Sequence, residues 1–516
     1  MAPNPGFVFV SCTGKDHKGD KKLMPRLRQH VMLHHLQEKD KRRRISVAST
    51  PMSRTSRSSR DSAEGSPATT DRSEETNIQH SSSDEQTLAV VPLTSESART
   101  SMGAPFDPFD ALPVKGVSDM GDIFIWFYSG QAPPASHQWQ NSTRYHWLDK
   151  HWEMTRQSRT MFNFSLCFAL EKKGIITHTS QATRIFKYRS AVLRAVQDDL
   201  TKHAHNLPGQ TVATIGGLAY IAIRDGDVDV AKAHIKAIAQ LAPLDRYEMY
   251  VWLYVVWTDL RVAAATFTIP TLKHYIPHEC RGSLGLSHED ITKATKLAFR
   301  NLAAFPAIGD QNTHAATQLF RKLHETCIAV DKVNVELTHL YGHLYDTQYK
   351  LLRITSRAWK TGDRPNETMV KILLLAVQLA FWTSTFYVLP QGRRFNVDLH
   401  SHLVQQMDKL GDIVSAWESY AGLDSLLWVA FVAAASAMEF DLSSVEPFIE
   451  VLKRAVARMD IRTRDDFKES LQLYPWTTHG SARMCPFVWA EISGEVYVPE
   501  SETPKRIFWI EEMAVR

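Results

Sequence analysis

The sequence predicts an all-α protein, an irregular superhelical array of antiparallel helix pairs that follows a disordered N-terminal region. Three observations lead to this prediction. From residue 119 onward, apolar residues return every three or four positions in one segment after another, which is the period of an amphipathic helix. No comparable run of alternating strands occurs. Residues 46–103 contain 23 Ser or Thr among 58 positions and no Phe, Trp or Tyr, so they cannot form a core.

Composition and charge divide the chain into a basic arm (1–45), a disordered Ser/Thr-rich linker (46–104) and an α-helical domain (105–516). Residues 1–60 hold 14 Lys or Arg against 4 Asp or Glu, whereas the remainder holds 46 against 52. The formal charge of +4 therefore hides a basic arm on an acidic body. Such an arm is attracted to polyanions.

The arm ends in the basic run Lys41, Arg42, Arg43 and Arg44. Three interpretations stay open: a nuclear localisation signal, contact with nucleic-acid phosphates without sequence specificity, and a solvated charge run with no specific role. Ser46 lies two residues beyond the run and is a candidate phosphorylation site, the alternative being an unmodified serine. Phosphorylation there would add negative charge beside the run and weaken its binding to polyanions.

The cysteines are scattered along the chain. Residues 1–105 contain only Cys12, and a zinc module needs several closely spaced cysteine or histidine ligands. We therefore expect no zinc cluster at the N-terminus. The other four lie far apart in sequence, which predicts buried, reduced thiols and no disulfide framework; they are Cys167, Cys280, Cys327 and Cys485.

Order is expected to resume at residues 105–113, with the sequence PFDPFDALP. Prolines fix the backbone here, and apolar side chains between them can dock on a helical body. We predict that this segment ties down the start of the domain. Its motif residues are Asp107, Pro108, Phe109, Leu112 and Pro113.

Helices are then predicted in close succession. The longest candidate, 313–357, keeps a three- or four-residue apolar step over about seven turns. The other predicted segments are 118–129, 143–157, 159–173, 180–204, 210–224, 228–241, 245–265, 287–303, 366–387, 396–420, 423–440, 444–458 and 463–472. Two apolar stretches within them, 369–389 and 426–440, are interpreted as central buried helices and not as membrane spans.

The segment 210–272 predicts a helix hairpin followed by a third helix. Gly226 permits the turn of the hairpin, and we expect the Asp227 side chain to accept a hydrogen bond from the first turn of the helix that follows. The third helix, 246–265, carries Asp259. If buried, this carboxylate needs a partner, and we expect a structural pairing with Arg261 or Lys273.

These residues also carry a resemblance. In the segment 210–272, a helix of small residues is followed by the Gly226-Asp227 turn and then by a set of residues at fixed spacings. This order resembles the regulatory domain of fungus-specific transcription factors. The spaced residues are Ala231, His234, Ile238, Trp257, Thr258, Asp259, Leu260, Arg261, Ala263 and Pro270. The segment 105–113 resembles the Asp-Pro-Phe and Leu-Pro motif ahead of the same domain. The block 7–44 resembles the N-terminus of those members that lack the zinc binuclear cluster.

The resemblance implies a nuclear transcription regulator that acts through a helical effector or protein-interaction domain. It implies protein partners in transcription, a homodimer among them, with nonspecific DNA contact through the basic arm and no membrane association. The alternative is a helical scaffold or adaptor with no direct DNA role.

We expect no enzymatic activity and no cofactor. No nucleophile motif occurs, and the pair Gly216-Gly217 lies inside a predicted helix without the lysine of a phosphate-binding loop. Two histidine pairs, His274 with His278 and His400 with His402, have spacings that invite a metal hypothesis, but neither belongs to a known motif. Aromatic residues could line an effector pocket, although ordinary core packing is the favoured interpretation; they are Trp252, Tyr254, Trp257, Trp382 and Phe386.

Overall fold

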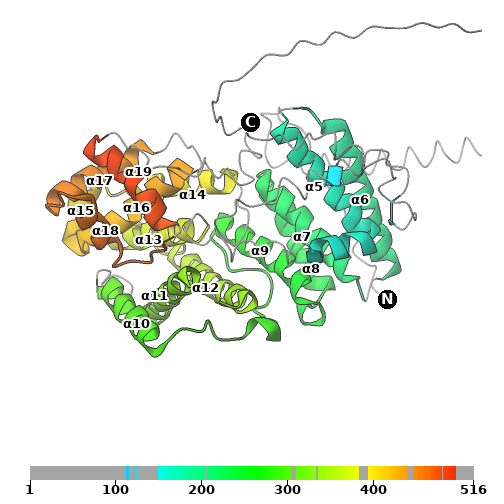
Figure 1. Cartoon of the computed structure of the whole chain (residues 1–516), viewed down its shortest axis with the longest axis horizontal. Helices are drawn as coiled ribbons and strands as arrows, with labels where there is room; N and C mark the ends of the chain where they lie inside the picture. Colours follow the sequence, from blue (N-terminus) through cyan, green and yellow to red (C-terminus); the bar gives the residue numbers. More distant parts are fainter. Residues whose placement is uncertain are drawn as a thin grey trace, which may run out of the picture. The chain divides into compact units, whose positions relative to one another are not determined.

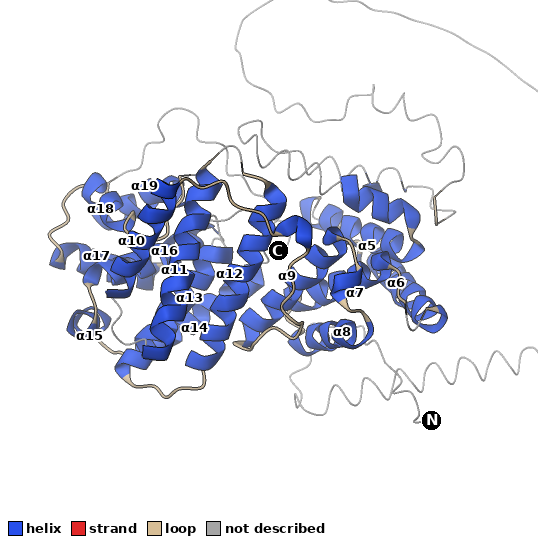
Figure 2. Ribbon diagram, turned by 90° about the horizontal axis from the view of Figure 1, so that it is seen from below, coloured by secondary structure: helices blue, strands red, loops and turns tan. Residues whose placement is uncertain are grey.

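The computed structural model describes residues 112–114, 120, 123–124, 149–177, 179–203, 206–303, 310–332, 335–382, 393–439, 445–478 and 480–495. The chain divides into two units, Met1–Pro108 and Phe109–Arg516, and all described residues belong to the second. The fold of this unit is all-α, an irregular superhelical array of helix pairs, as predicted. The described residues contain no strand (Figure 2).

The N-terminal part of the unit contains two helix pairs and two single helices (Figure 1). A single helix over 149–157 comes first. The two pairs and the second single helix, α9, follow in the order α5 (Arg159–Ile176), α6 (Ala182–Lys202), α7 (Gly209–Arg224), α8 (Val228–Leu241) and α9 (Met249–Thr266). Within the pairs, α5 packs on α6 and α7 on α8, while α9 covers both α7 and α8. The predicted bounds of α8, 228–241, are confirmed.

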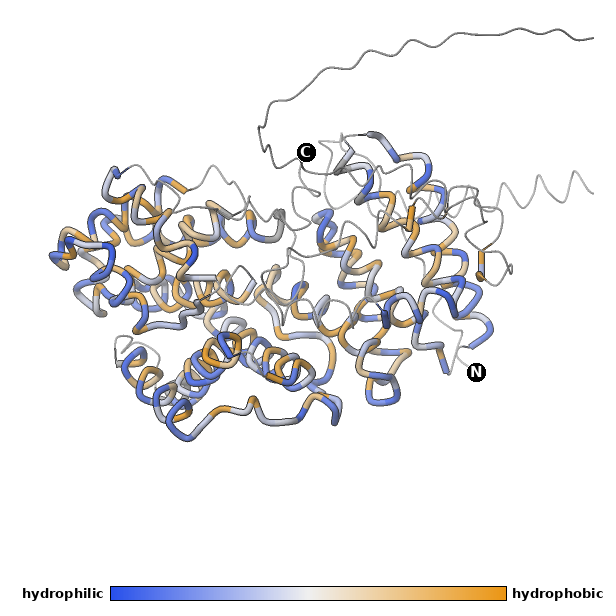
Figure 3. Tube along the Cα trace, in the orientation of Figure 1, coloured by the Kyte–Doolittle hydropathy of each residue, from blue (hydrophilic) through white to orange (hydrophobic). Residues whose placement is uncertain are grey.

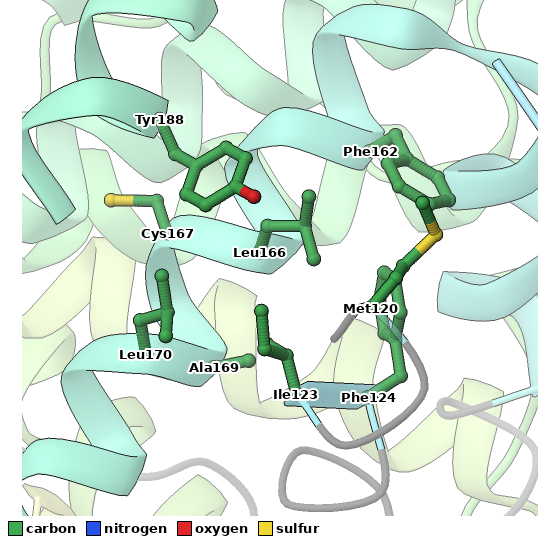
Figure 4. Close-up of a cluster of buried hydrophobic side chains, with 9 residues drawn as sticks. All are labelled: Met120, Ile123, Phe124, Phe162, Leu166, Cys167, Ala169, Leu170 and Tyr188. Carbon is green, nitrogen blue, oxygen red and sulfur yellow. The ribbon is translucent and has the colours of Figure 1, made fainter. Parts of the chain in front are cut away.

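An apolar cluster joins the start of the unit to α5 and α6 (Figure 4). Leu112 packs against this cluster, so the predicted docking of this residue on the helical body is confirmed. Pro113 follows it in a bend and is partly buried. The buried members of the cluster are Met120, Ile123, Phe124, Phe162, Leu166, Cys167, Ala169, Leu170 and Tyr188.

Glycines allow α5, α7 and α9 to pack closely. A Cβ atom on Gly217 would lie 2.3 Å from Cζ of Phe164 in α5. On Gly216 it would lie 3.1 Å from a methyl group of Val255 in α9. The glycine pair that is costly inside a helix therefore has a packing role here, between two neighbouring helices.

The middle of the unit consists of α10 (His288–Ala303), α11 (Asp310–Asp331) and α12 (Leu337–Ala358). The prediction of a single helix over 313–357 is wrong, because one helix ends at Asp331 and another begins at Leu337. The apolar period continues through the break because each helix buries one face. The chain turns back, so α11 buries its face against α10 and α12.

The C-terminal part contains α13 (Pro365–Trp382), α14 (Arg393–Asp408), α15 (Ile413–Tyr420), α16 (Leu423–Glu439), α17 (Glu446–Arg458), α18 (Arg464–Leu471) and α19 (Ser481–Ser493). Along most helices hydrophilic and hydrophobic residues alternate (Figure 3). By contrast, α13 is buried along nearly its whole length and packs against α12, α14 and α16. None of the described helices combines the length and apolar character that a membrane span requires.

Two further predictions of the C-terminal part are corrected. The predicted helix 396–420 is two helices, because Gly411 adopts a left-handed conformation with φ of 63° and turns the chain between α14 and α15. Helix α19 was not predicted at all. It contains Pro486, a residue that normally argues against a helix interior.

The four cysteines within the described residues are buried and carry no disulfide. Burial raises the pKa of the Cys167 and Cys327 thiols, because the thiolate loses its hydration. The predicted buried thiols are confirmed for this part of the chain.

Candidate functional site

Several predicted positions lie outside the described residues. They are Lys41, Arg42, Arg43, Arg44, Ser46, Asp107, Pro108 and Phe109. Of the remaining motif positions, Leu112 and Pro113 lie at the start of the unit. The others lie in the turn between α7 and α8, on α8 and α9, and in the segment that follows α9.

The turn between α7 and α8 contains Gly226, whose φ of 79° requires a residue without a side chain, as predicted. Asp227 is the N-cap of α8, but its side chain accepts no hydrogen bond from the helix. Its expected capping role is therefore wrong. Instead, the backbone closes the turn, since the amide of Asp227 donates to the carbonyl of Ala222 at 2.7 Å.

His234 lies on the buried side of α8, the helix that packs against α7 and α9. Burial lowers its pKa to about 4, because a charged imidazolium would lose its hydration. The ring is therefore neutral near pH 7. This places His234 in the structure as a core residue.

The aromatic residues of α9 are core residues. Trp252 is fully buried, and its indole N–H donates to the carbonyl of Tyr275 at 3.0 Å. Trp257 packs edge-on against Trp382 of α13, with 5.9 Å between ring centroids. Phe386, the fifth aromatic residue of the pocket hypothesis, lies outside the described residues. The favoured interpretation as core packing is confirmed for Trp252 and Trp257.

Asp259 connects α9 to the segment that directly follows Pro270. Its carboxylate accepts hydrogen bonds from the amides of Thr271 at 3.0 Å and Leu272 at 2.9 Å, directly after the buried Pro270. The pairing is structural, as expected, but its partners are backbone amides and not Arg261 or Lys273. Because Asp259 is only 2% exposed, desolvation raises its pKa to about 6.

Arg261 lies two residues beyond Asp259 in α9 and is also buried. Its guanidinium lies over the ring of Tyr220 at 5.0 Å and over that of Trp382 at 5.3 Å. These cation–π contacts link α7, α9 and α13. The residue therefore stabilises the junction of three helices.

A charged cluster lies where the segment after α9 meets α11 and α12. Asp346 of α12 contacts three basic groups: Nε2 of His274 at 3.2 Å, Nζ of Lys322 at 2.9 Å and Nζ of Lys350 at 2.7 Å. Hydrogen bonds from these groups outweigh burial and hold the pKa of Asp346 well below its usual range. Asp346 thus stays ionised and cannot serve as a general base near pH 7. We name Asp346, His274, Lys322 and Lys350 the α12 cluster.

Neither histidine pair converges on a common point. His274 belongs to the α12 cluster, whereas His278 pairs with Glu279 at 3.1 Å. His400 is buried and contacts the hydroxyl of Ser436 at 3.1 Å, while His402 packs edge-on against Phe267. Among the described residues, no group of His, Cys, Asp and Glu side chains has a metal-binding arrangement.

A buried polar network was missed by sequence reasoning. His151 contacts the hydroxyl of Tyr254 through Nδ1 and that of Ser165 through Nε2, the latter at 3.0 Å. The pair resembles a base and a nucleophile, but Ser165 has no exposed surface and burial lowers the pKa of His151 to about 3. The network therefore ties the helix 149–157 to α5 and α9. Ser165 and Tyr254 lie 14 and 103 residues from His151 in sequence, so no local sequence pattern reveals the network.

The α12 cluster is the candidate functional site, because three basic groups meet there and two of them, His274 and Lys350, are exposed. Two lysines and a histidine surround one carboxylate, so positive charge remains for an anionic ligand. No protein-family model matches this chain, and neither does any curated protein or solved structure. The resemblance to a regulatory domain therefore rests on its quoted motifs.

Proposed function

We propose that this protein is a nuclear regulator of transcription that acts through protein partners of its helical domain. The basic arm carries the chain into the nucleus through Lys41–Arg44 and contacts DNA phosphates without sequence specificity. The helical domain supplies the regulatory contacts and performs no catalysis. Protein partners in transcription, including a second copy of the chain, bind this domain.

The proposal is supported most by the combination of a basic N-terminal region with an all-α domain in one chain. Residues 1–60, which include the arm, hold 14 Lys or Arg against 4 Asp or Glu, and an all-α array of helix pairs follows. Arrays of helix pairs present extended surfaces to protein partners. The arm gives affinity for polyanions, and this affinity must fall steeply with added salt.

The test is the cellular distribution of the full chain fused to a fluorescent protein. The expected result is nuclear accumulation for the native sequence and its loss when Lys41, Arg42, Arg43 and Arg44 are all replaced by Gln. A matched control replaces three arginines of the linker, Arg54, Arg57 and Arg60, and should stay nuclear. A native chain that remains in the cytoplasm would contradict the proposal and favour the helical scaffold or adaptor.

A further inference from the structure

One face of α12 is basic along its C-terminal half. Lys350, Arg353 and Arg357 follow at steps of three and four residues, which places them on one side of the helix. Lys360 continues the row just beyond the helix end, and all four residues are exposed. With a rise of about 1.5 Å per residue, the row is about 15 Å long. We name these four residues the α12 basic row.

Three residues of this row carry charge that no ion pair neutralises. Within the described part of the chain, no carboxylate forms an ion pair with Arg353, Arg357 or Lys360. The fourth, Lys350, pairs with Asp346, and the Asp346 carboxylate also pairs with Lys322 of α11. Excess positive charge therefore extends along the C-terminal end of the helix.

Aromatic rings lie beside the row. Tyr349 precedes Arg353 by four residues, so the two are neighbours on the helix surface. The ring of Tyr349 packs edge-on against that of His274, with 4.7 Å between centroids, and the His274 side chain is 39% exposed. A line of positive charge next to aromatic rings is the arrangement with which proteins bind single-stranded nucleic acid.

We propose that the α12 basic row binds the phosphate backbone of a single-stranded nucleic acid, with a base stacked on the ring of Tyr349. A single small anion would need basic groups that converge on one point, whereas this row has the repeating charge that a chain of phosphates matches. The ring favours a nucleic acid over an acidic peptide, because each base has a flat face that stacks. The inference goes beyond the proposed function, since it concerns the folded domain and not the arm.

The test uses the full chain and fluorescein-labelled oligo(dT) across a salt series, with oligo(U) and a DNA duplex as parallel probes. Replacing Arg353, Arg357 and Lys360 by Gln should lower the slope of log affinity against log salt by about 2, because each phosphate that the protein neutralises contributes roughly 0.7 to this slope. The control replaces Lys453, Arg454 and Arg458 of α17 by Gln. These residues are also exposed, but Arg454 and Arg458 pair with Asp412 and Glu418, so the slope should stay unchanged.

A second variant separates the ring from the charges. Tyr349→Leu should weaken binding to the single strand by about tenfold, the scale of one stacked base, and leave the salt slope unchanged. All variants are checked for native circular dichroism and thermal unfolding. Equal slopes for the native and α12 triple variants would overturn the proposal. So would an equal loss in the α17 control, unchanged affinity in Tyr349→Leu, or competition by polyglutamate as effective as that by the unlabelled strand.

Discussion

The buried carboxylate of Asp259 gives a pH dependence that can be worked out from the structure. Desolvation raises its pKa from 3.8 in the unfolded chain to about 6 in the folded protein. Between these values the folded state binds more protons than the unfolded state, so the free energy of unfolding falls as the pH rises. At 1.36 kcal/mol per pKa unit the full shift corresponds to about 3 kcal/mol, of which about 2.4 kcal/mol is lost between pH 4 and pH 7.

The variant Asp259→Asn removes this titration. Its amide oxygen accepts from only one of the two backbone amides of Thr271 and Leu272, while its NH2 group faces the other, which costs about 1–3 kcal/mol at every pH. The difference in unfolding free energy, variant minus native, should therefore rise by about 2.4 kcal/mol from pH 4 to pH 7.

Urea unfolding followed by tryptophan fluorescence at pH 4, 5, 6 and 7 measures this difference. Asp198→Asn is the control, because it removes an exposed carboxylate on α6 and should give a far smaller change with pH. A difference that stays flat for Asp259→Asn across this range would refute the reasoning. It would mean that the folded carboxylate does not titrate near pH 6.

Four further single substitutions test packing, capping and backbone conformation by thermal unfolding. Gly217→Ala should cost about 1–3 kcal/mol, since its Cβ would meet the ring of Phe164 in α5, and Phe164→Leu in the same chain should recover part of the loss; additive losses would count against the contact. Thr463→Ala should cost about 1 kcal/mol, because its hydroxyl accepts from the amide of Asp466 at 3.1 Å. Asp227→Ala, at an N-cap without such a bond, should cost much less. Asp460→Gly should add about 1 kcal/mol of stability, because Asp460 has a φ of 53°; a lower melting temperature would contradict this.

Helix positions followed from the sequence where local signals mark both ends. For α8, Gly226 marks the start and Pro243 closely follows the end, so the predicted bounds agree with the structure. The helix predicted over 313–357 failed because an apolar period records which side is buried, and it continues when the chain turns back on itself. Helix α19 was missed because tertiary packing overrides the penalty of Pro486.

The partners and exposure of individual polar side chains were harder to predict from the sequence. Asp259 was recognised as a carboxylate in need of a partner, but sequence proximity pointed to Arg261 and Lys273. Its actual partners are backbone amides 12 and 13 residues further on, and backbone amides leave no mark in a sequence pattern. The sequence alone shows that Lys350, Arg353 and Arg357 are spaced three and four residues apart, as on one face of a helix. Only the packing of α12 shows that this face is exposed.

The central claim, that the helical domain regulates transcription through partners, is tested most directly by tethering. The full chain is fused to a heterologous DNA-binding domain, and transcription is measured from a reporter that carries the matching operator. The account predicts that the fusion raises or lowers reporter transcription relative to the DNA-binding domain alone. Output equal to that of the DNA-binding domain alone, from a fusion that occupies the operator, would contradict it.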